Sequence, residues 1–430
     1  MYDTIADHPW SENIVRLRKS QTGKVGKVST PTIAQEGKGI ILTGSNGPAS
    51  MPVVIAVPKE LTIGEDRVAT VPEVVQKLTK SGYEVRIEHD AGMNAFYPDA
   101  LYLAAGAKIA SSQKDLLNGA RIVLHVQPPT ISEIDQLDEG TIVIGFMNAT
   151  NNLEAVARMR DRKITAFALE LVPRITRAQS MDALSSQATA GGYTAAILGA
   201  NNCPKFLPML TTAAGTIRPA TVLILGAGVA GLMAIATAKR LGAIVEAYDV
   251  RRAAGEQVRS LGAKFLELEI NAEGQGGYAR ELTTGEKAME QQMVSAAVAR
   301  ADIVITTANI PGRKAPLLIT KETVATMRPG AVIVDLAAES GGNCELTQAG
   351  KTVREHGVMI MGPQNLPARI PFHASQMYAK NLQSFLGLLF DKDGTIVKEF
   401  SDEILIASLL VHAGEVRHGP TRDLMSGGKP

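Results

Sequence analysis

The sequence predicts an α/β protein built on two parallel β-sheets, each covered by helices. Three observations lead to this prediction. From Met51 onward, short apolar runs alternate with stretches of helical periodicity, a pattern typical of parallel sheets with helices on both faces. One apolar run leads directly into a glycine-rich turn and a helix. The length of 430 residues allows two to three domains, and a hydrophobic content of 45% can fill their cores.

The glycine-rich turn lies in the segment Thr221–Asp249, whose order of elements is that of a dinucleotide-binding unit. A buried strand leads into Gly226, Gly228 and Gly231, and a helix and a second strand ending on Asp249 follow. Gly226 allows the tight turn, Gly228 lets the backbone approach a pyrophosphate, and Gly231 lets the helix pack closely. The helix N-terminus offers N–H donors to the phosphates. These features predict a Rossmann-like domain, and the alternative is an ordinary strand–turn–helix that binds nothing.

Asp249 predicts which dinucleotide this unit binds. A carboxylate at the end of the second strand accepts hydrogen bonds from ribose hydroxyls and repels a 2′-phosphate. This favours NAD over NADP. Arg251 and Arg252 follow closely enough in the chain to weaken that preference.

Residues 1–50 differ from the rest because they are polar and rich in Gly, Ser, Thr and Lys. We expect a flexible N-terminal extension with a short helix at Trp10–Arg18. No apolar stretch resembles the core of a secretory signal. A transit peptide stays an alternative, although Asp3, Asp7 and Glu12 are unusual for one.

The first predicted α/β domain covers residues 51–190. Lys59 and Arg67 follow its first strand, at the end of the sheet where such domains place ligands. Candidate strands are Val53–Val57, Glu84–Glu88, Ile122–Val126, Ile142–Phe146 and Thr165–Leu169, and candidate helices are Val71–Lys80 and Leu153–Arg160.

The second predicted domain, the NAD-binding one, covers residues 200–365 and is reached through a helix at Ser185–Leu198. A glycine-rich loop at Asn271–Gln291 contains Tyr278. A loop of this length is usually either functional, here as a lid, or disordered. Beyond the strands of the glycine unit, candidate strands are Phe265–Leu268, Asp302–Thr306, Ala331–Asp335 and Val358–Met361.

The last segment, residues 370–430, is predicted to return to the first domain and complete it. Apolar residues at helical spacing indicate a long helix at 374–389, and a second helix is expected at Asp402–Ala413. Long helices passing between the domains would leave a cleft between them. The long helix is also compatible with a dimer interface, and an intramolecular role is the alternative.

The overall composition excludes several classes of protein. A net charge of +1 gives no electrostatic footprint for nucleic acid. Cys203 and Cys344 form no zinc or redox motif, so we expect no metal. No apolar run approaches the roughly 18 residues of a membrane span.

A second polar cluster follows the strand Thr165–Leu169. Its side chains could converge on the cleft, where an amide and a hydroxyl can hold a carboxamide or a phosphate. The alternative is helix capping by the aspartate with the other residues solvated. The cluster contains Arg174, Gln179, Asp182 and Ser185.

These motifs resemble a known family. Pro58–Glu60 with Gly64–Ala69 resembles the start of the alanine dehydrogenase and pyridine nucleotide transhydrogenase superfamily. The block Arg174–Gln187 resembles the signature of its transhydrogenase branch, in particular domain I, the NAD(H)-binding α or α1 part of proton-translocating NAD(P)+ transhydrogenases. The resemblance covers about 51–418 and includes Gly226–Gly231, Asp249–Arg251, the Tyr278 loop, Thr307–Gly312 and Asp335–Gly342.

The resemblance implies a role for each matching residue. The nicotinamide end of the site, with the catalytic residues, would be lined by Arg174, Gln179, Asp182 and Ser185. Around the pyrophosphate and the adenosine ribose it implies Gly226, Gly228, Val229, Gly231, Asp249, Val250 and Arg251. Tyr278 would close on the bound nucleotide, and Gly277 and Ile310 would contribute backbone contacts near the adenosine half.

Two positions separate the branches of the superfamily by their chemistry. In the alanine dehydrogenase pattern a lysine and a histidine follow two strands of the first domain, and here Gln127 and Asn148 stand at those positions. Neither side chain titrates near neutrality, so the acid/base groups for an amino acid substrate are missing. His89 and His125 remain nearby, and we expect His125 to lie in the core or on the other side of its strand.

The resemblance therefore implies a component that binds NAD(H) and passes hydride directly to NADP(H) on a partner chain. Proton movement would take place in a transmembrane partner. The chain would be a homodimer, a natural subunit or part of a longer chain, cytoplasmic and peripheral on the inner membrane through its partners, or on the matrix side in a eukaryote. Alternatives are an alanine dehydrogenase-like oxidoreductase and a non-catalytic NAD-sensing or scaffold protein.

Overall fold

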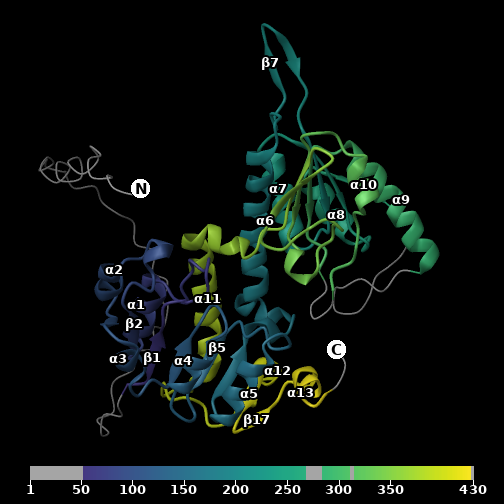
Figure 1. Ribbon diagram of the computed structural model, residues 1–430. Helices are drawn as coiled ribbons and strands as arrows, with labels where there is room; N and C mark the ends of the chain where they lie inside the picture. Colours follow the sequence, from purple (N-terminus) through teal and green to yellow (C-terminus); the bar gives the residue numbers. More distant parts are fainter. Residues whose placement is uncertain (1–51, 268–282, 310–313, 428–430) are drawn as a thin grey trace, which may run out of the picture. The chain divides into compact units, whose positions relative to one another are not determined.

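The computed structural model describes residues 52–267, 283–309 and 314–427 (Figure 1). The predicted helix at Trp10–Arg18, the rest of the N-terminal extension, and Gly277, Tyr278 and Ile310 lie outside these ranges. Within them the chain forms two large sheets and a separate two-stranded sheet. No helix of the described part is long and apolar enough to cross a membrane.

The first sheet has eight strands in the order β17-β16-β6-β5-β4-β1-β2-β3. Strands β1 to β6 run parallel in the order 3-2-1-4-5-6, which is that of dinucleotide-binding sheets. Strands β16 and β17 extend the β6 edge in antiparallel fashion. The strands are β1 (Val54–Val57), β2 (Glu84–Glu88), β3 (Lys108–Ala110), β4 (Ile122–Leu124), β5 (Ile142–Gly145), β6 (Thr165–Ala168), β16 (Leu409–His412) and β17 (Glu415–Val416).

Helices cover both faces of this sheet, because its strands are apolar on both sides. Ile55 and Val57 of β1 belong to a core that includes Phe385, whereas Val54 and Ala56 belong to the core of the opposite face. The helical segments around it are α1 (Pro72–Lys80), η2 (Met93–Ala95), α2 (Asp99–Ala104), α3 (Gln113–Leu117), α4 (Ile131–Asp135), α5 (Leu153–Asp161), η3 (Leu169–Leu171), η4 (Thr176–Met181), α11 (Pro371–Leu389), α12 (Glu403–Ser408) and α13 (Gly419–Met425).

The second sheet has seven strands in the order β11-β10-β9-β12-β13-β15-β14. Its first five strands repeat the 3-2-1-4-5 order, and β14 pairs antiparallel with β15 at the edge. The strands are β9 (Thr221–Leu225), β10 (Ile244–Tyr248), β11 (Lys264–Phe265), β12 (Ile303–Thr306), β13 (Val332–Asp335), β14 (Thr352–Glu355) and β15 (Val358–Met361). The helical segments are α7 (Val229–Arg240), α8 (Ala254–Ser260), α9 (Thr284–Arg300), α10 (Lys321–Ala325), η6 (Ala338–Ser340) and η7 (Leu366–Arg369).

One long helix, α6 (Ala183–Asn202), carries the chain from the first sheet to the second (Figure 1). It packs against α7 and also contacts α11, η7, β12 and β13. The chain then forms an exposed antiparallel hairpin, β7 (Leu210–Thr212) and β8 (Gly215–Ile217), before it enters β9. Residues 362–371 bring it back to the first sheet.

Every apolar run predicted as a strand contributes to a strand of one of the sheets, but two other predictions are wrong in part. The predicted helix at Asp402–Ala413 ends at Ser408, because the apolar residues that follow pair with β6 as β16. The predicted loop at Asn271–Gln291 ends early, because Thr283 and Glu286 form a capping box that starts α9.

Candidate functional site

The glycine turn between β9 and α7 constrains two of its three glycines and leaves open space at the third. Gly226 has φ +99°, a conformation that side chains rarely adopt. A Cβ on Gly231 would lie 1.9 Å from the carbonyl oxygen of Gly226, so only glycine fits there. A Cβ on Gly228 would meet nothing within 4 Å. The tight turn and the close packing are present as predicted, and the approach of a pyrophosphate to Gly228 stays a prediction.

Asp249, at the end of β10, is paired with its neighbour Arg251. Nε and Nη2 of Arg251 donate to the two carboxylate oxygens, each at 2.9 Å. The backbone N–H of Ala227 in the glycine turn donates to Oδ2 at 2.8 Å. The carboxylate predicted to accept ribose hydroxyls therefore already points at the turn, where a guanidinium holds it.

The end of β12 contacts the glycine turn, and the end of β13 supports the loop after β12, through residues for which no role was predicted. Oγ1 of Thr307 donates to the carbonyl of Gly226 at 2.8 Å. Asp335 is fully buried and accepts the backbone N–H of Asn343 at 2.8 Å. Asn343 in turn donates from Nδ2 to the carbonyl of Ala308 at 2.8 Å. Thr307 and Asp335 belong to motifs of the family resemblance, but those motifs do not reveal that the two residues brace the loop beside the turn.

The polar cluster before α6 begins at Arg174, just before η4, and runs through η4 into the first turn of the helix. Asp182 is the N-cap of α6: its Oδ1 accepts the backbone N–H of Ser185 at 2.8 Å and its Oδ2 accepts the Ser185 hydroxyl at 2.6 Å. The capping alternative is thus correct for Asp182. Arg174 and Gln179 lie in the preceding segment with exposed side chains. The roles of all four residues toward a nucleotide stay predictions.

This segment is anchored by contacts from the C-terminal part of the chain. Arg177 donates to both carboxylate oxygens of Asp402, at 2.7 and 3.0 Å. Asn381 of α11 donates to the carbonyl of Ser180 at 2.9 Å and accepts the hydroxyl of Ser186 at 2.6 Å. No sequence pattern indicates these anchors, because their partners lie about two hundred residues away in the chain.

Helix α6 joins the polar segment to the glycine turn. A Cβ on Gly192 would lie 2.0 Å from the carbonyl oxygen of Ala230, so α6 packs directly against the first turn of α7. Ser185 and Gly192 are seven residues apart, roughly 10 Å along a helix. The two groups of predicted site residues are therefore connected by one rigid element.

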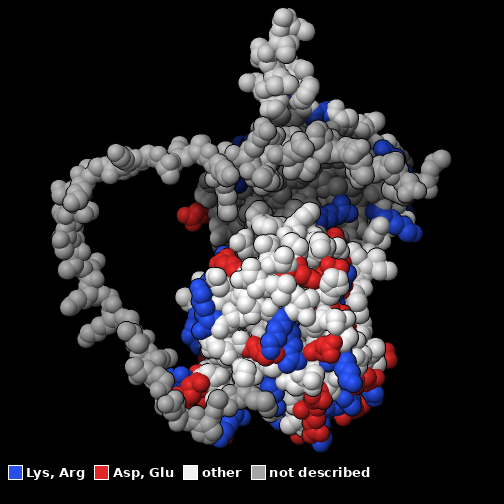
Figure 2. Space-filling view, turned by 90° about the vertical axis from the view of Figure 1, so that its left-hand side faces the viewer, with Lys and Arg blue, Asp and Glu red and all other residues white. Residues whose placement is uncertain are grey.

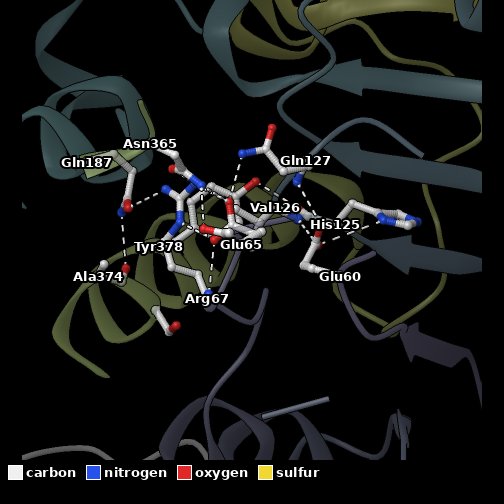
Figure 3. Close-up of polar contacts among 12 residues, drawn as sticks. Glu60, Glu65, Arg67, His125, Val126, Gln127, Gln187, Asn365, Ala374 and Tyr378 are labelled. Atoms are coloured by element: carbon white, nitrogen blue, oxygen red, sulfur yellow. Dashed lines mark hydrogen bonds and ion pairs between the residues drawn. The ribbon is translucent and has the colours of Figure 1, made fainter. Parts of the chain in front are cut away.

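At the strand ends of the first sheet, buried polar groups of the protein form hydrogen bonds with one another (Figure 3). Glu60 accepts the backbone N–H groups of Val126 and Gln127 at 2.5 and 3.1 Å, and His125 Nδ1 lies 3.9 Å from its carboxyl group. Burial raises the pKa of Glu60 to about 8 and lowers the pKa of His125. Both groups are therefore driven toward their uncharged forms. His125 lies in the core, as predicted.

The two positions that distinguish the branches of the superfamily carry amides with local partners. Gln127 donates from Nε2 to Glu65 at 2.7 Å. Asn148 is exposed, with φ +46°, and accepts a hydrogen bond from Asn151. His89 lies at the surface, with Nδ1 2.6 Å from Asp99. On the face drawn in Figure 2, described basic and acidic side chains are interspersed, in line with the net charge of +1.

The strand order of the two sheets, the glycine turn and the carboxylate of Asp249 together define a dinucleotide-binding α/β protein of the Rossmann-like class. Residues 56–190 match the family model "Alanine dehydrogenase/PNT, N-terminal domain", and residues 195–419 match the corresponding C-terminal domain. The chain therefore belongs to the alanine dehydrogenase/PNT family.

Similar proteins fall in both branches of this family. The first part of NAD(P) transhydrogenase subunit alpha from Rhodospirillum rubrum is 48% identical, over 85% of this chain and 97% of that protein. Alanine dehydrogenase of Bacillus subtilis is 30% identical, over 74% of this chain and 81% of that protein. The crystal structure of transhydrogenase from Sinorhizobium meliloti matches with a TM-score of 0.75 and 43% identity, over 85% of this chain and 99% of that one. The chain is thus more similar to these transhydrogenase proteins than to the alanine dehydrogenase.

Proposed function

We propose that the chain is the NAD(H)-binding component of a proton-translocating NAD(P)+ transhydrogenase. It exchanges hydride between NAD(H) and NADP(H) that is held on a partner chain. The observation that carries the proposal is the geometry of the second sheet: a glycine turn with open space at Gly228 and a strand-end carboxylate, Asp249, directed at that turn. The identity of 48% to a transhydrogenase alpha subunit favours this function over others of the family.

In this proposal the dinucleotide lies across the carboxyl ends of β9, β10 and β12. The pyrophosphate sits at the N-terminus of α7, where Val229 and the residues before it offer backbone N–H groups. Asp249 and Arg251 face the adenosine ribose. The nicotinamide extends toward Gln179 and Ser185, on the segment that α6 connects to the turn.

Hydride exchange between two nicotinamides needs no proton transfer at the reacting carbons. The contribution of the chain is then to position the ring and to exclude water, so that the carbons can approach to roughly 3–3.5 Å. Gln179 orients the ring, and Asp182 holds its segment by capping α6. The amides Gln127 and Asn148 are compatible with this chemistry, because neither has to exchange a proton.

The test combines the chain with the NADP(H)-binding component of a related transhydrogenase and NADPH. Reduction of an acetylpyridine analogue of NAD is followed. We expect Gln179→Ala to leave NADH affinity within a few-fold while hydride transfer falls by orders of magnitude. Thr176→Ala, an exposed substitution in the same 3₁₀ helix, is the matched control. Normal turnover by Gln179→Ala would remove Gln179 from the site.

Partners and location follow from the same proposal. The NADP(H)-binding and transmembrane subunits are separate chains or separate parts of a longer one, and they hold this component at the cytoplasmic face of the inner membrane, or at the matrix side in a eukaryote. Two copies of the chain form a homodimer. Co-purification with the partner subunits and measurement of the molar mass in solution test these points.

The second candidate is an alanine dehydrogenase-like reaction, favoured by the 30% identity to an alanine dehydrogenase. It needs a cation for the substrate carboxylate. Arg67, a cation at the strand ends of the first sheet, is buried, and its guanidinium already donates to Glu65, Gln187 and Asn365. NADH oxidation that depends on pyruvate and ammonium, catalysed by the chain alone, would establish this candidate in place of the first.

A further inference from the structure

A buried cluster of charged and amide side chains lies outside the nucleotide site, next to the strand ends of the first sheet (Figure 3). We call it the Arg67 cluster, and it consists of Glu65, Arg67, Gln127, Gln187 and Asn365. Arg67 Nε and Nη2 donate to the two oxygens of Glu65 at 2.7 and 2.6 Å. The side chain of Glu65 is fully buried and that of Arg67 is 3% exposed.

The remaining donors of Arg67 reach the two segments by which the chain leaves and re-enters the first sheet. Nη1 donates to Oε1 of Gln187 on α6 at 2.8 Å. Nη2 also donates to Oδ1 of Asn365 at 3.0 Å, in the returning segment. Asn365 has φ +46° and donates back to Glu65 at 3.0 Å. We call these two segments, α6 and the returning segment with Asn365, the crossings. One guanidinium therefore holds both crossings to the loop after β1.

The cluster extends into the long helix of the return. Gln187 donates from Nε2 to the carbonyl of Ala374 in the first turn of α11 at 3.1 Å. The backbone N–H of Val68 donates to the hydroxyl of the fully buried Ser375 at 3.0 Å. The loop after β1, α6 and α11 are thus joined by side-chain hydrogen bonds of defined direction.

Stability alone is a weak explanation for such a cluster. A buried ion pair is costly to desolvate, and well-packed apolar residues often serve equally well. What directional hydrogen bonds add is geometry. Gln187 lies two residues after Ser185 on α6, so its position sets that of the first turn of α6 and of the segment with Gln179.

We propose that Arg67 is a positioning residue for hydride transfer. Through Gln187 and Asn365 it fixes the angle at which α6 presents the nicotinamide-facing segment, so that the ring meets its partner at the transfer distance. The inference rests on the proposed function. It predicts an effect on the transfer step rather than on NADH binding, because Asp249 is held by Ala227 and Arg251 of the second sheet, whereas the cluster lies at the first.

The test uses Gln187→Met, which keeps the volume and leaves the Glu65–Arg67 pair in place. We expect the NADH dissociation constant to stay within threefold. The rate of transfer from partner-bound NADPH to the acetylpyridine analogue, per titrated NADH site, should fall at least tenfold. In Arg67→Lys, which keeps the positive charge but loses the branched set of guanidinium N–H donors, the transfer rate should fall by a similar factor. The double variant with both substitutions should transfer hydride no more slowly than the single variants, because both substitutions break the same hydrogen bond between Arg67 and Gln187.

Tyr102→Phe is the matched control for a loss of stability. Tyr102 is fully buried, and its hydroxyl donates at 2.8 Å to the carbonyl of Thr70, three residues after Arg67, in a bond that involves neither α6 nor the returning segment. This variant should lower the melting temperature and leave the rate per site unchanged. An unchanged rate per site in Gln187→Met would overturn the inference. Absence of transfer by the unaltered chain with its partner would instead refute the proposed function.

Discussion

The pairing of Asp249 with Arg251 leads to a quantitative prediction about nucleotide selectivity. A bare carboxylate at this position repels a 2′-phosphate, but here Arg251 neutralises it through two hydrogen bonds of 2.9 Å. When a nucleotide takes up the carboxylate oxygens, the guanidinium of Arg251 stays beside the ribose. We therefore expect Arg251→Ala to weaken NADPH binding much more than NADH binding.

The magnitude follows from the charges and their exposure. Two unit charges about 5 Å apart interact by about 3 kcal/mol at an effective dielectric constant near 20. The side chain of Arg251 is 29% exposed, and screening by solvent reduces this to about 1–2 kcal/mol. NADPH affinity should then fall roughly 10-fold or more, whereas NADH affinity should change less than about 3-fold.

Equilibrium titration of both nucleotides by fluorescence measures this selectivity directly. Arg252→Ala is the control, because it removes the same charge from the next, exposed residue. It should leave the ratio of the two dissociation constants near that of the unaltered chain. If Arg251→Ala changed both affinities by the same factor, Arg251 would be an ordinary contact and the electrostatic reasoning would be wrong.

Three further predictions concern stability. Glu60 has a pKa of about 8 in the folded state against 4.5 for the free side chain, so its stabilising contribution is present below about pH 4.5 and is lost as the pH rises toward 8. In Glu60→Gln, urea unfolding should show a smaller loss of free energy between pH 5 and 8; an identical pH dependence would contradict the assignment. Gly231→Ala should lower the unfolding free energy by about 2–3 kcal/mol, whereas Gly228→Ala should keep stability and lose NADH binding; equal stability of the two variants would argue against the geometry of the turn. Asp182→Ala should cost about 1 kcal/mol as a lost N-cap, with Asp182→Asn restoring most of it in thermal unfolding; a cost shared equally by Asn would point to the charge instead.

Periodicity and turn chemistry predicted most of the fold. Parallel strands such as β2 and β15 were placed correctly, because β15 is continuously apolar and β2 alternates regularly between buried apolar and half-buried charged residues. The residues of β16 were predicted as helix, because a short apolar run does not by itself distinguish a helix from an edge strand. The division into domains stays a prediction, which the membership of the two sheets supports.

The site was predictable only where its residues are close in sequence. The glycine turn and Asp249 lie within one strand–helix–strand unit, so their proximity followed from local structure. The pairing of Asp249 with Arg251 depends on rotamers and was not foreseen. Anchors such as Asn381, or the role of Arg67, depend on contacts across hundreds of residues that no local pattern encodes.

The position of β16 and β17 in the first sheet has a consequence for biosynthesis. These strands come from residues 409–416, whereas β1 to β6 come from residues 54–168. During translation, the edge of β6 emerges from the ribosome long before the strand that covers it, and the whole second sheet is synthesised in between. The second sheet can therefore fold completely before the first sheet does. Until β16 is synthesised, the β6 edge of the first sheet stays open and is prone to pairing with other nascent chains.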